Sequence, residues 1–215
     1  SVPPDADGDP VLRRFGNAIA EHAGHIAWAA YLSTTGVYGD HGGAWIDEDT
    51  ALTPNTERGW RRLRAEESWM QLHSQHGLPL HVFRLAGIYG PIPTCRVEIE
   101  TQPGQIFSRI HVDDIAGILL ASMAKPNPGA AYNVADDEPC PPQDVVEFAA
   151  RLLGRPVPPD IPFDAAELSP MARSFYADSK RVSNRKVQEE LGYRFHYPGY
   201  KEGLRALLSQ RGSAT

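Results

Sequence analysis

The chain has 215 residues, of which 41% are hydrophobic and 22% are charged, and its formal net charge is -6 at pH 7. A chain of this length can bury one hydrophobic core. Its acidic balance, with a pI of about 5.7, argues against nucleic acid as a partner. No apolar run reaches the ~20 residues that would cross a bilayer, so we expect no membrane partner. The two cysteines, Cys95 and Cys140, form no disulfide framework and no Cys-x-x-Cys pair, which favours a cytoplasmic location.

The first predicted elements are a helix over 10–22 and a strand over 25–33. Asp9 is a good N-cap residue, and Pro10 suits the first helical position because its missing N–H is not needed there. The strand is an apolar run that ends in hydroxyl side chains at 33–35. This pattern is typical of a buried parallel strand that delivers side chains to the carboxyl edge of a sheet, where α/β proteins bind their ligands.

The rest of the chain alternates between the two element types. Helices are predicted over 55–76, 114–123, 141–153, 180–191 and 200–209, and strands over 80–85, 106–112 and 131–134. Short apolar strands that alternate with helices predict an α/β fold, in which helices cover both faces of a parallel sheet.

Several short segments carry recognisable patterns. They read Ser-Thr-Thr-Gly-Val-Tyr-Gly over 33–39, Leu-Ala-Gly-Ile-Tyr-Gly-Pro over 85–91, Ile-His-Val-Asp-Asp-Ile-Ala over 110–116 and Tyr-Asn-Val over 132–134, followed by Asp178-Ser-Lys180, Leu191-Gly192 and Glu202-Gly-Leu204. In this order they resemble the extended short-chain dehydrogenase/reductases, the family of NAD-dependent epimerases and dehydratases. The resemblance covers nearly the whole chain. It implies the C-terminal half of a doubly wound Rossmann sheet and either NADP or NAD as cofactor.

The resemblance also implies a domain division and site residues. Residues 1–91 and 106–138 would form the Rossmann part, and 92–105 and 139–215 a small substrate-binding lobe. Thr34 stands where the family has the hydroxyl that polarises the substrate carbonyl or alcohol; alternatively, it only satisfies backbone groups of the next loop. The implied cofactor contacts are Val2, Pro3, Arg62, Gly87 and Ile88, and the implied substrate contacts are Thr35, Arg58, Arg173, Ser174 and Tyr176.

Two departures from the family pattern matter. The phosphate-binding Gly-x-x-Gly-x-x-Gly turn has no credible counterpart, because the literal match over 36–42 is followed by no helix. Since the chain also begins with Ser1, we expect it to be the C-terminal part of a longer protein that carries the dinucleotide-binding half upstream. The family's Tyr-x-x-x-Lys slots hold Arg58 and Arg62. Arginine does not exchange a proton near neutral pH, so the proton donor is unassigned.

Several residues keep two interpretations. Tyr38 either replaces the missing tyrosine or is a packing residue. The arginines at 58–64 either bind a phosphate or carboxylate or form a solvated helix face paired with Glu57, Glu66 and Glu67. His111 and Asp114 are either a catalytic pair or, as we favour, a satisfied strand histidine and a helix cap.

Two functions are therefore considered. The first is an NAD(P)-dependent oxidoreductase or epimerase that acts on a sugar nucleotide or a small carbonyl or alcohol substrate. The second is a catalytically inactive NADP(H)-binding or protein-interaction member of the same fold. A homodimer through the helices 10–22 and 55–76 is a possible assembly.

We predict that these 215 residues do not fold alone as a stable monomer, because the strand 25–33 would have an open edge. Thermal melting together with a mass measurement in solution checks this expectation. A cooperative two-state transition of a monomer would contradict it.

Overall fold

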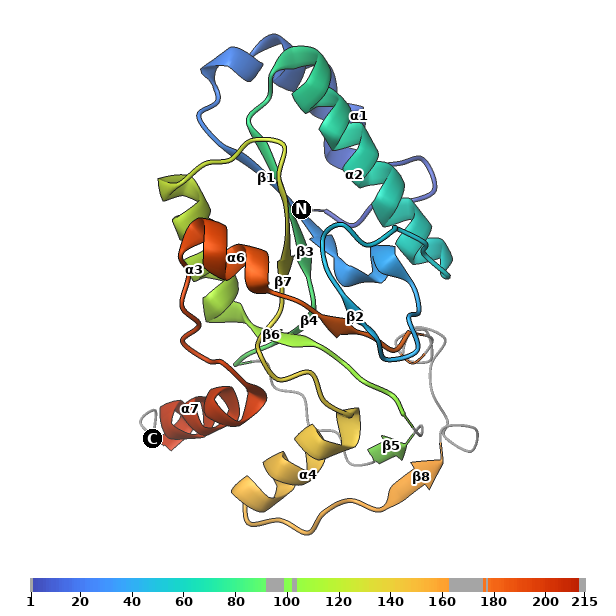
Figure 1. Ribbon diagram of the computed structural model, residues 1–215, viewed down its shortest axis with the longest axis vertical. Helices are drawn as coiled ribbons and strands as arrows, with labels where there is room; N and C mark the ends of the chain where they lie inside the picture. The colour runs from blue at the N-terminus through green and yellow to red at the C-terminus, as the bar shows by residue number, and fades with distance from the viewer. Residues whose placement is uncertain (1, 92–98, 102–103, 163–175, 177, 213–215) are drawn as a thin grey trace.

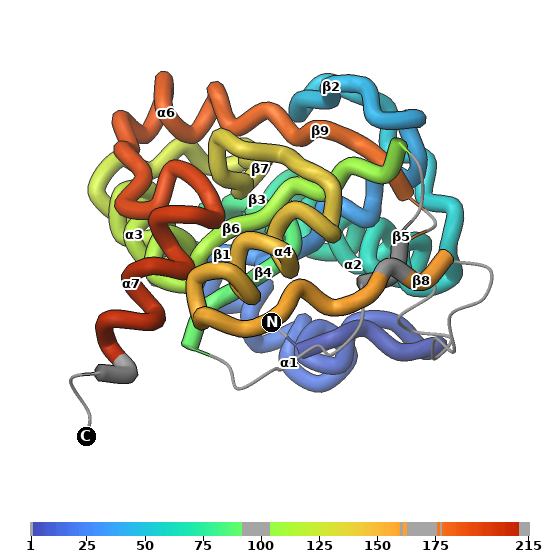
Figure 2. The backbone as a smooth tube through the Cα atoms, turned by 90° about the horizontal axis from the view of Figure 1, so that it is seen from below, coloured from blue at the N-terminus to red at the C-terminus, as the bar shows by residue number. Residues whose placement is uncertain are grey.

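The computed structural model describes residues 2–91, 99–101, 104–162, 176 and 178–212. Its centre is a parallel sheet of three strands in the order β1-β3-β7, formed by Ala29–Thr34, Leu80–Leu85 and Ala131–Val134. Helices α1 (Pro10–Glu21) and α2 (Glu57–His76) lie on one face of this sheet, and α3 (Val112–Ala124) and α6 (Arg185–Leu191) lie on the other (Figures 1 and 2). The predicted α/β fold is therefore confirmed.

The helices on the first face begin and end as their sequence signals predict. In α1 (Pro10–Glu21), Asp9 Oδ1 accepts hydrogen bonds from the N–H groups of Val11 and Leu12 at 2.9 and 3.0 Å. In α2 (Glu57–His76), Thr56 Oγ1 accepts from the Gly59 N–H at 3.1 Å. Helix α2 ends at Gly77, whose left-handed φ of 71° is one that glycine adopts without strain.

Three predicted elements have wrong boundaries. The strand predicted over 106–112 covers only Arg109–His111 (β6), because α3 already begins at Val112. The first strand begins at Ala29, because 23–25 form a short 3-10 turn in which the His25 N–H bonds to the His22 carbonyl. The helix predicted over 180–191 covers only Arg185–Leu191 (α6). The residues before it include strand β9 (Arg181–Val182), which pairs with β2 (Trp45–Ile46) inside the loop that follows β1.

The remaining elements gather beyond the carboxyl ends of the central strands (Figure 1). Two further parallel pairs join β4 to β6 and β5 to β8. The elements are β4 (Gly87–Tyr89), β5 (Ile99–Thr101), β6 (Arg109–His111), β8 (Asp160–Pro162), α4 (Pro142–Leu152) and α7 (Tyr200–Gly212). Their division into a Rossmann part and a lobe at the boundaries given above stays a prediction.

The hydrophobic core consists of two clusters, one on each face of the sheet. Between the sheet and α1 and α2, Tyr31, Leu80 and Val82 are buried, and Trp69 and Met70 of α2 pack against them. On the opposite face the buried cluster includes Phe83, Tyr132, Ile118, Val187 and Leu191. Both faces of the sheet are therefore covered by helices that supply apolar side chains.

His111 and Asp114 have roles that differ from those expected. His111 is the residue that caps α3, since its Nδ1 accepts from the Asp113 N–H at 3.2 Å. Asp114 is fully buried and accepts from the Tyr193 hydroxyl at 2.8 Å and from the His196 N–H at 2.8 Å. Asp114 therefore anchors the segment before α7 and does not cap a helix, and a catalytic His111–Asp114 pair is not formed.

A buried ion pair joins α2 to the central strand. The Arg84 guanidinium lies 3.0 Å from the Glu66 carboxylate, and the two side chains are 8% and 5% exposed. Arg84 also donates to the Tyr38 hydroxyl at 2.8 Å, and that hydroxyl donates to Asn133 Oδ1 of β7 at 2.9 Å. Glu66 thus pairs with the sheet and not with the arginines of its own helix.

Asp136, two residues beyond β7, is a second buried charge-bearing group. It is 1% exposed, its Oδ1 accepts from the Glu138 N–H at 3.2 Å, and its Oδ2 has no hydrogen-bond partner among the described residues. The nearby Arg109 guanidinium donates to the carbonyls of Phe107 and Cys140. Burial therefore raises the pKa of Asp136 to about 8.

Replacing Arg84 by Met is expected to destabilise the protein by about 3–5 kcal/mol, because the Glu66 carboxylate is left buried without its counter-charge. The double substitution Glu66→Met with Arg84→Met removes both charges and should cost clearly less. Denaturant unfolding of the full-length wild-type protein and of the two variants measures the difference. A double variant that is at least as unstable as the single one would contradict this account of the pair.

The substitution Asp136→Asn should stabilise the protein at pH 8 and above by at least about 1.4 kcal/mol, the free energy of one pKa unit. Because the folded pKa lies above the usual 3.8, the native state holds the proton more tightly than the unfolded chain. The contribution of Asp136 to stability is therefore present near pH 4 and lost as the pH rises to about 8. Unfolding free energies of the two proteins should diverge across this window, and a difference that does not change with pH would refute the assignment.

Candidate functional site

The carboxyl ends of the central strands line up at one edge of the sheet. Thr34 pairs in register with Leu85, and Leu85 pairs with Val134. The segments that follow these strands, the turn after β1 and strand β4 among them, start from this edge. In open α/β sheets this edge is where ligands bind.

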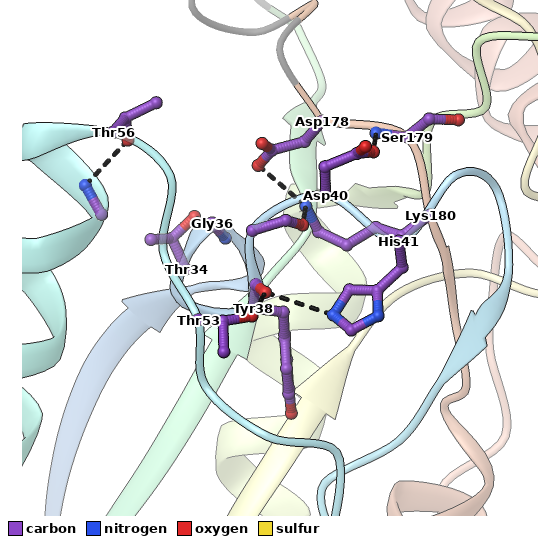
Figure 3. A network of polar contacts seen from close by, with 12 residues as sticks. Thr34, Gly36, Tyr38, Asp40, His41, Thr53, Thr56, Asp178, Ser179 and Lys180 are labelled. Carbon is purple, nitrogen blue, oxygen red and sulfur yellow. Dashed lines mark hydrogen bonds and ion pairs between the residues drawn. The ribbon is translucent and has the colours of Figure 1, made fainter.

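Thr34 ends β1 and is partly exposed. Its Oγ1 accepts a hydrogen bond from the Gly36 N–H at 3.2 Å (Figure 3). A hydroxyl that accepts in this way still has its own proton to donate. The side chain therefore organises the turn, as the structural alternative expects, and can also donate to an oxygen at the sheet edge.

The turn after Thr34 is held by side chains from several segments. It consists of a 3-10 helix, η2 (Thr35–Tyr38), and Gly39 with φ of 73°. A Cβ atom at Gly39 would collide with the carbonyl oxygen of Thr53, so only glycine fits. The Tyr38 carbonyl accepts from the Thr53 hydroxyl at 2.9 Å and lies 3.2 Å from His41 Nε2.

The Tyr38 phenol points away from this edge into the core. It is fully buried between Arg84 and Asn133, and burial raises its pKa to about 12. Such a phenol neither reaches solvent nor exchanges its proton near neutral pH. The geometry favours the packing interpretation of Tyr38.

The two arginines in the Tyr-x-x-x-Lys slots lie in different environments. Arg62 Nη1 donates to the Tyr31 hydroxyl at 3.1 Å and to the Leu32 carbonyl at 3.2 Å, and its guanidinium lies over the Tyr31 ring. Arg58 is exposed in the first turn of α2. Arg61 pairs with Glu57 at 3.0 Å, as expected for a solvated helix face.

Two side-chain oxygens beside β1 are buried without hydrogen-bond partners among the described residues. They are Asp9 Oδ2 and Ser33 Oγ, and the two residues are 6% and 5% exposed. Asp9 stands at the start of α1 and Ser33 directly precedes Thr34. Both oxygens are enclosed, so neither can contact a ligand unless the residues around it move.

The other predicted site residues are spread over the surface and the interior. Val2 and Ile88 are 48% and 51% exposed, and Pro3 and Gly87 are also exposed. Thr35 is partly exposed, whereas Tyr176 is buried against the edge of the Phe107 ring. Arg173 and Ser174 lie outside the described residues.

The segment Asp178–Lys180 ends the loop 168–180, which the sequence predicts as a substrate contact. What the sequence does not predict is that this segment contacts the turn after Thr34 (Figure 3). The charged Lys180 is 7% exposed. Lysines are almost never buried without a partner, and nothing in the sequence shows that Lys180 is buried, so no signal was available.

Two of the cavities that the described residues form have no predicted site residue in their lining. One of about 400 Å³ lies between α1 and α2, and one of about 510 Å³ lies between the loop 45–49 and α6. In the described part of the chain, no cluster of three or more His, Cys, Asp or Glu side chains could hold a metal ion. None of the described helices has the length and apolar content to cross a membrane.

Comparisons with known proteins place this geometry in a wider context. No protein-family model matches the chain. YeeZ from Escherichia coli (strain K12) is 29% identical over 78% of the chain, and the chain spans 58% of the length of YeeZ. The 3-diazoavenalumate denitrifying reductase from Streptomyces sp is 25% identical, and the match covers 94% of the chain and 73% of the reductase.

Two solved structures are similar to this protein, one at low sequence identity and one at high sequence identity. An NAD complex of dTDP-glucose 4,6-dehydratase from Bacillus anthracis superimposes with a TM-score of 0.75 at 18% identity, covering 92% of the chain and 65% of the enzyme. A conserved protein of unknown function from Silicibacter pomeroyi DSS superimposes with a TM-score of 0.92 at 55% identity, covering 98% of the chain and 76% of that protein. The chain belongs to the family of this Silicibacter pomeroyi protein, and its fold is that of the NAD-dependent epimerases and dehydratases.

Proposed function

We propose that the chain forms the substrate side of an NAD(P)-dependent oxidoreductase or epimerase that acts on a sugar nucleotide or a small carbonyl or alcohol. The observation that carries this proposal is Thr34, a partly exposed hydroxyl at the carboxyl end of β1 whose oxygen is oriented by the Gly36 N–H. The fold of NAD-bound enzymes and the similarity to a Streptomyces reductase support it.

The dinucleotide, where bound, supplies hydride transfer. The residues of this chain that would hold it are Arg62, which is partly exposed, and the exposed apolar surfaces of Val2 and Ile88. Pro3 and Gly87 complete the proposed cofactor contacts. The choice between NADP and NAD depends on residues that contact the adenosine half.

Substrate contacts are assigned by the same reasoning. Thr34 donates a hydrogen bond to the substrate oxygen, which stabilises negative charge as it develops there. Arg58 offers an exposed positive charge that suits a phosphate or carboxylate. Thr35 and the loop that contains Arg173, Ser174 and Tyr176 complete the proposed substrate contacts.

An inactive member of the fold is the second candidate. Arg62 is bound to the Tyr31 hydroxyl and the Leu32 carbonyl, and Tyr38 is locked in the core. Neither group supplies an exchangeable proton near neutral pH. An NADP(H)-binding or interaction protein would need only the fold and the cofactor contacts. For either function we propose a cytoplasmic location and a homodimer through α1 and α2.

The substitution Thr34→Val should lower kcat by about 100-fold or more, because one donor to the developing oxyanion is lost. With a panel of small aldehydes and ketones, the assay is stopped-flow oxidation of NADPH and NADH by the full-length protein. With UDP-glucose, UDP-glucuronic acid and dTDP-glucose, which are alcohols, the assay is reduction of NADP and NAD together with analysis of the sugar products. Calorimetry measures the affinity for each dinucleotide, which should change little.

Thr34→Ser is the matched control, since it keeps the hydroxyl and should retain most of the activity. Dinucleotide binding without turnover of any substrate by the wild-type protein would favour the inactive candidate. Absence of any dinucleotide binding would refute both candidates.

A further inference from the structure

Thr34 depends on the turn that follows it. The Gly36 N–H that orients the Thr34 hydroxyl belongs to η2, and the Gly39 N–H closes this turn onto the Gly36 carbonyl at 3.4 Å. A displacement of the backbone at Gly39 therefore changes the position of the Gly36 N–H. The direction of the Thr34 hydroxyl follows from it.

The carbonyl of Gly39 is held by a buried charge from a distant part of the chain. Lys180 Nζ donates to this carbonyl at 2.7 Å and to Asp178 Oδ2 at 2.9 Å. The side chains of Lys180 and Asp178 are 9% and 16% exposed. A hydrogen bond from an ammonium to a carbonyl is stronger than a neutral one, and shielding from water strengthens it further.

The main chain of the same segment binds the loop that continues from the turn. The Ser179 carbonyl accepts from the N–H groups of His41 and Gly43 at 3.1 and 2.8 Å. The Ser179 N–H donates to Asp40 Oδ1 at 2.8 Å and holds the pKa of that carboxyl below its usual range. Figure 3 shows Asp178, Ser179 and Lys180 beside this loop, with Tyr38 between them and Thr34.

The opposite side of the segment is also fixed. The Ser179 hydroxyl donates to the Gly104 carbonyl at 3.2 Å and accepts from the Ile106 N–H at 3.0 Å. The Lys180 N–H donates to the Ile106 carbonyl at 3.4 Å. The segment 178–180 is thus a bridge between 104–106 and the loop 39–43.

The two ends of the turn are anchored independently. The Tyr38 ring is held in the core by Arg84 and Asn133, whereas the Gly39 carbonyl is held by Lys180. Removing Lys180 should therefore release the Gly39 end and leave the core network intact. A role in orienting Thr34 can then be separated from a general role in stability.

We propose that Lys180 is a positioning residue for the Thr34 hydroxyl, acting through the Gly39 carbonyl. The inference rests on the proposed function, because that function is what gives the Thr34 hydroxyl its role. The hydrogen bond from Lys180 to the Gly39 carbonyl can be tested whether or not the protein turns over a substrate. No part of the proposed cofactor contacts is involved.

The test compares Lys180→Met and Lys180→Arg in the full-length protein. Amide hydrogen exchange over 34–43 reports the turn directly, because the Gly36 N–H bonds to the Thr34 hydroxyl. Lys180→Met should accelerate exchange at Gly36 by about 10-fold or more, the loss expected for a hydrogen bond from a charged donor. Lys180→Arg, which can still donate to the Gly39 carbonyl, should restore most of the protection.

A matched control and a second variant keep the test decisive. Lys186→Met removes an equal charge on α6, where the ammonium lies over the Tyr132 ring at 5.3 Å, and should leave exchange over 34–43 unchanged. Asp178→Asn keeps the lysine but removes its counter-charge, and should give a smaller acceleration confined to the same segment. If Lys180→Met does not fold, exchange over 34–43 in Asp178→Asn tests the same inference.

Activity supplies an independent readout. With any substrate that the wild-type protein turns over, Lys180→Met should lower kcat by at least about 10-fold while KM and dinucleotide affinity change less than about twofold. Unchanged exchange at Gly36, equal acceleration across the whole protein, or no recovery with Lys180→Arg would overturn the inference. Absence of turnover in the wild-type protein would count against the proposed function alone, because the exchange result does not depend on it.

Discussion

The guanidinium of Arg84 is the group on which the candidate site depends. It lies on the central strand, pairs with Glu66 of α2 and donates to the Tyr38 hydroxyl, which in turn reaches Asn133 on β7. A buried charge is tolerated only when its partners are in place. The helix, the sheet and the turn after β1 therefore adopt their positions together, and the turn that carries Thr34 is tied to the core.

This arrangement explains how an exposed hydroxyl can have a defined direction. The side chain of Tyr38 is fixed from inside the protein, and its carbonyl and that of Gly39 are fixed by Thr53, His41 and Lys180 from outside. A loop held on both sides loses little further conformational freedom when a ligand binds. Such preorganisation is what a donor to a developing charge requires.

The sequence predicted the elements whose signals are local and missed those that depend on distant contacts. The capping residue Asp9, the terminating Gly77 and the apolar strand 80–85 each act within a few residues, and the structure has them as expected. The pairing of β2 with β9 joins segments that lie far apart along the chain and leaves no periodic pattern in two residues per strand. The anchoring role of Asp114 likewise depends on residues 193–197, which no local rule could supply.

The chemistry that the site can support is limited by the lack of a Tyr-x-x-x-Lys pair, whose positions hold Arg58 and Arg62. Burial raises the pKa of Tyr31 and of Tyr38 to about 12 and raises that of Tyr89 as well, so none of these phenols is an efficient acid near neutral pH. Thr34 can still polarise an oxygen, and polarisation with hydride delivery is enough for reduction when the proton comes from solvent. Epimerisation needs the proton to be removed and returned within the site. A reductase is therefore the form of the proposed activity that places the smaller demand on the residues present.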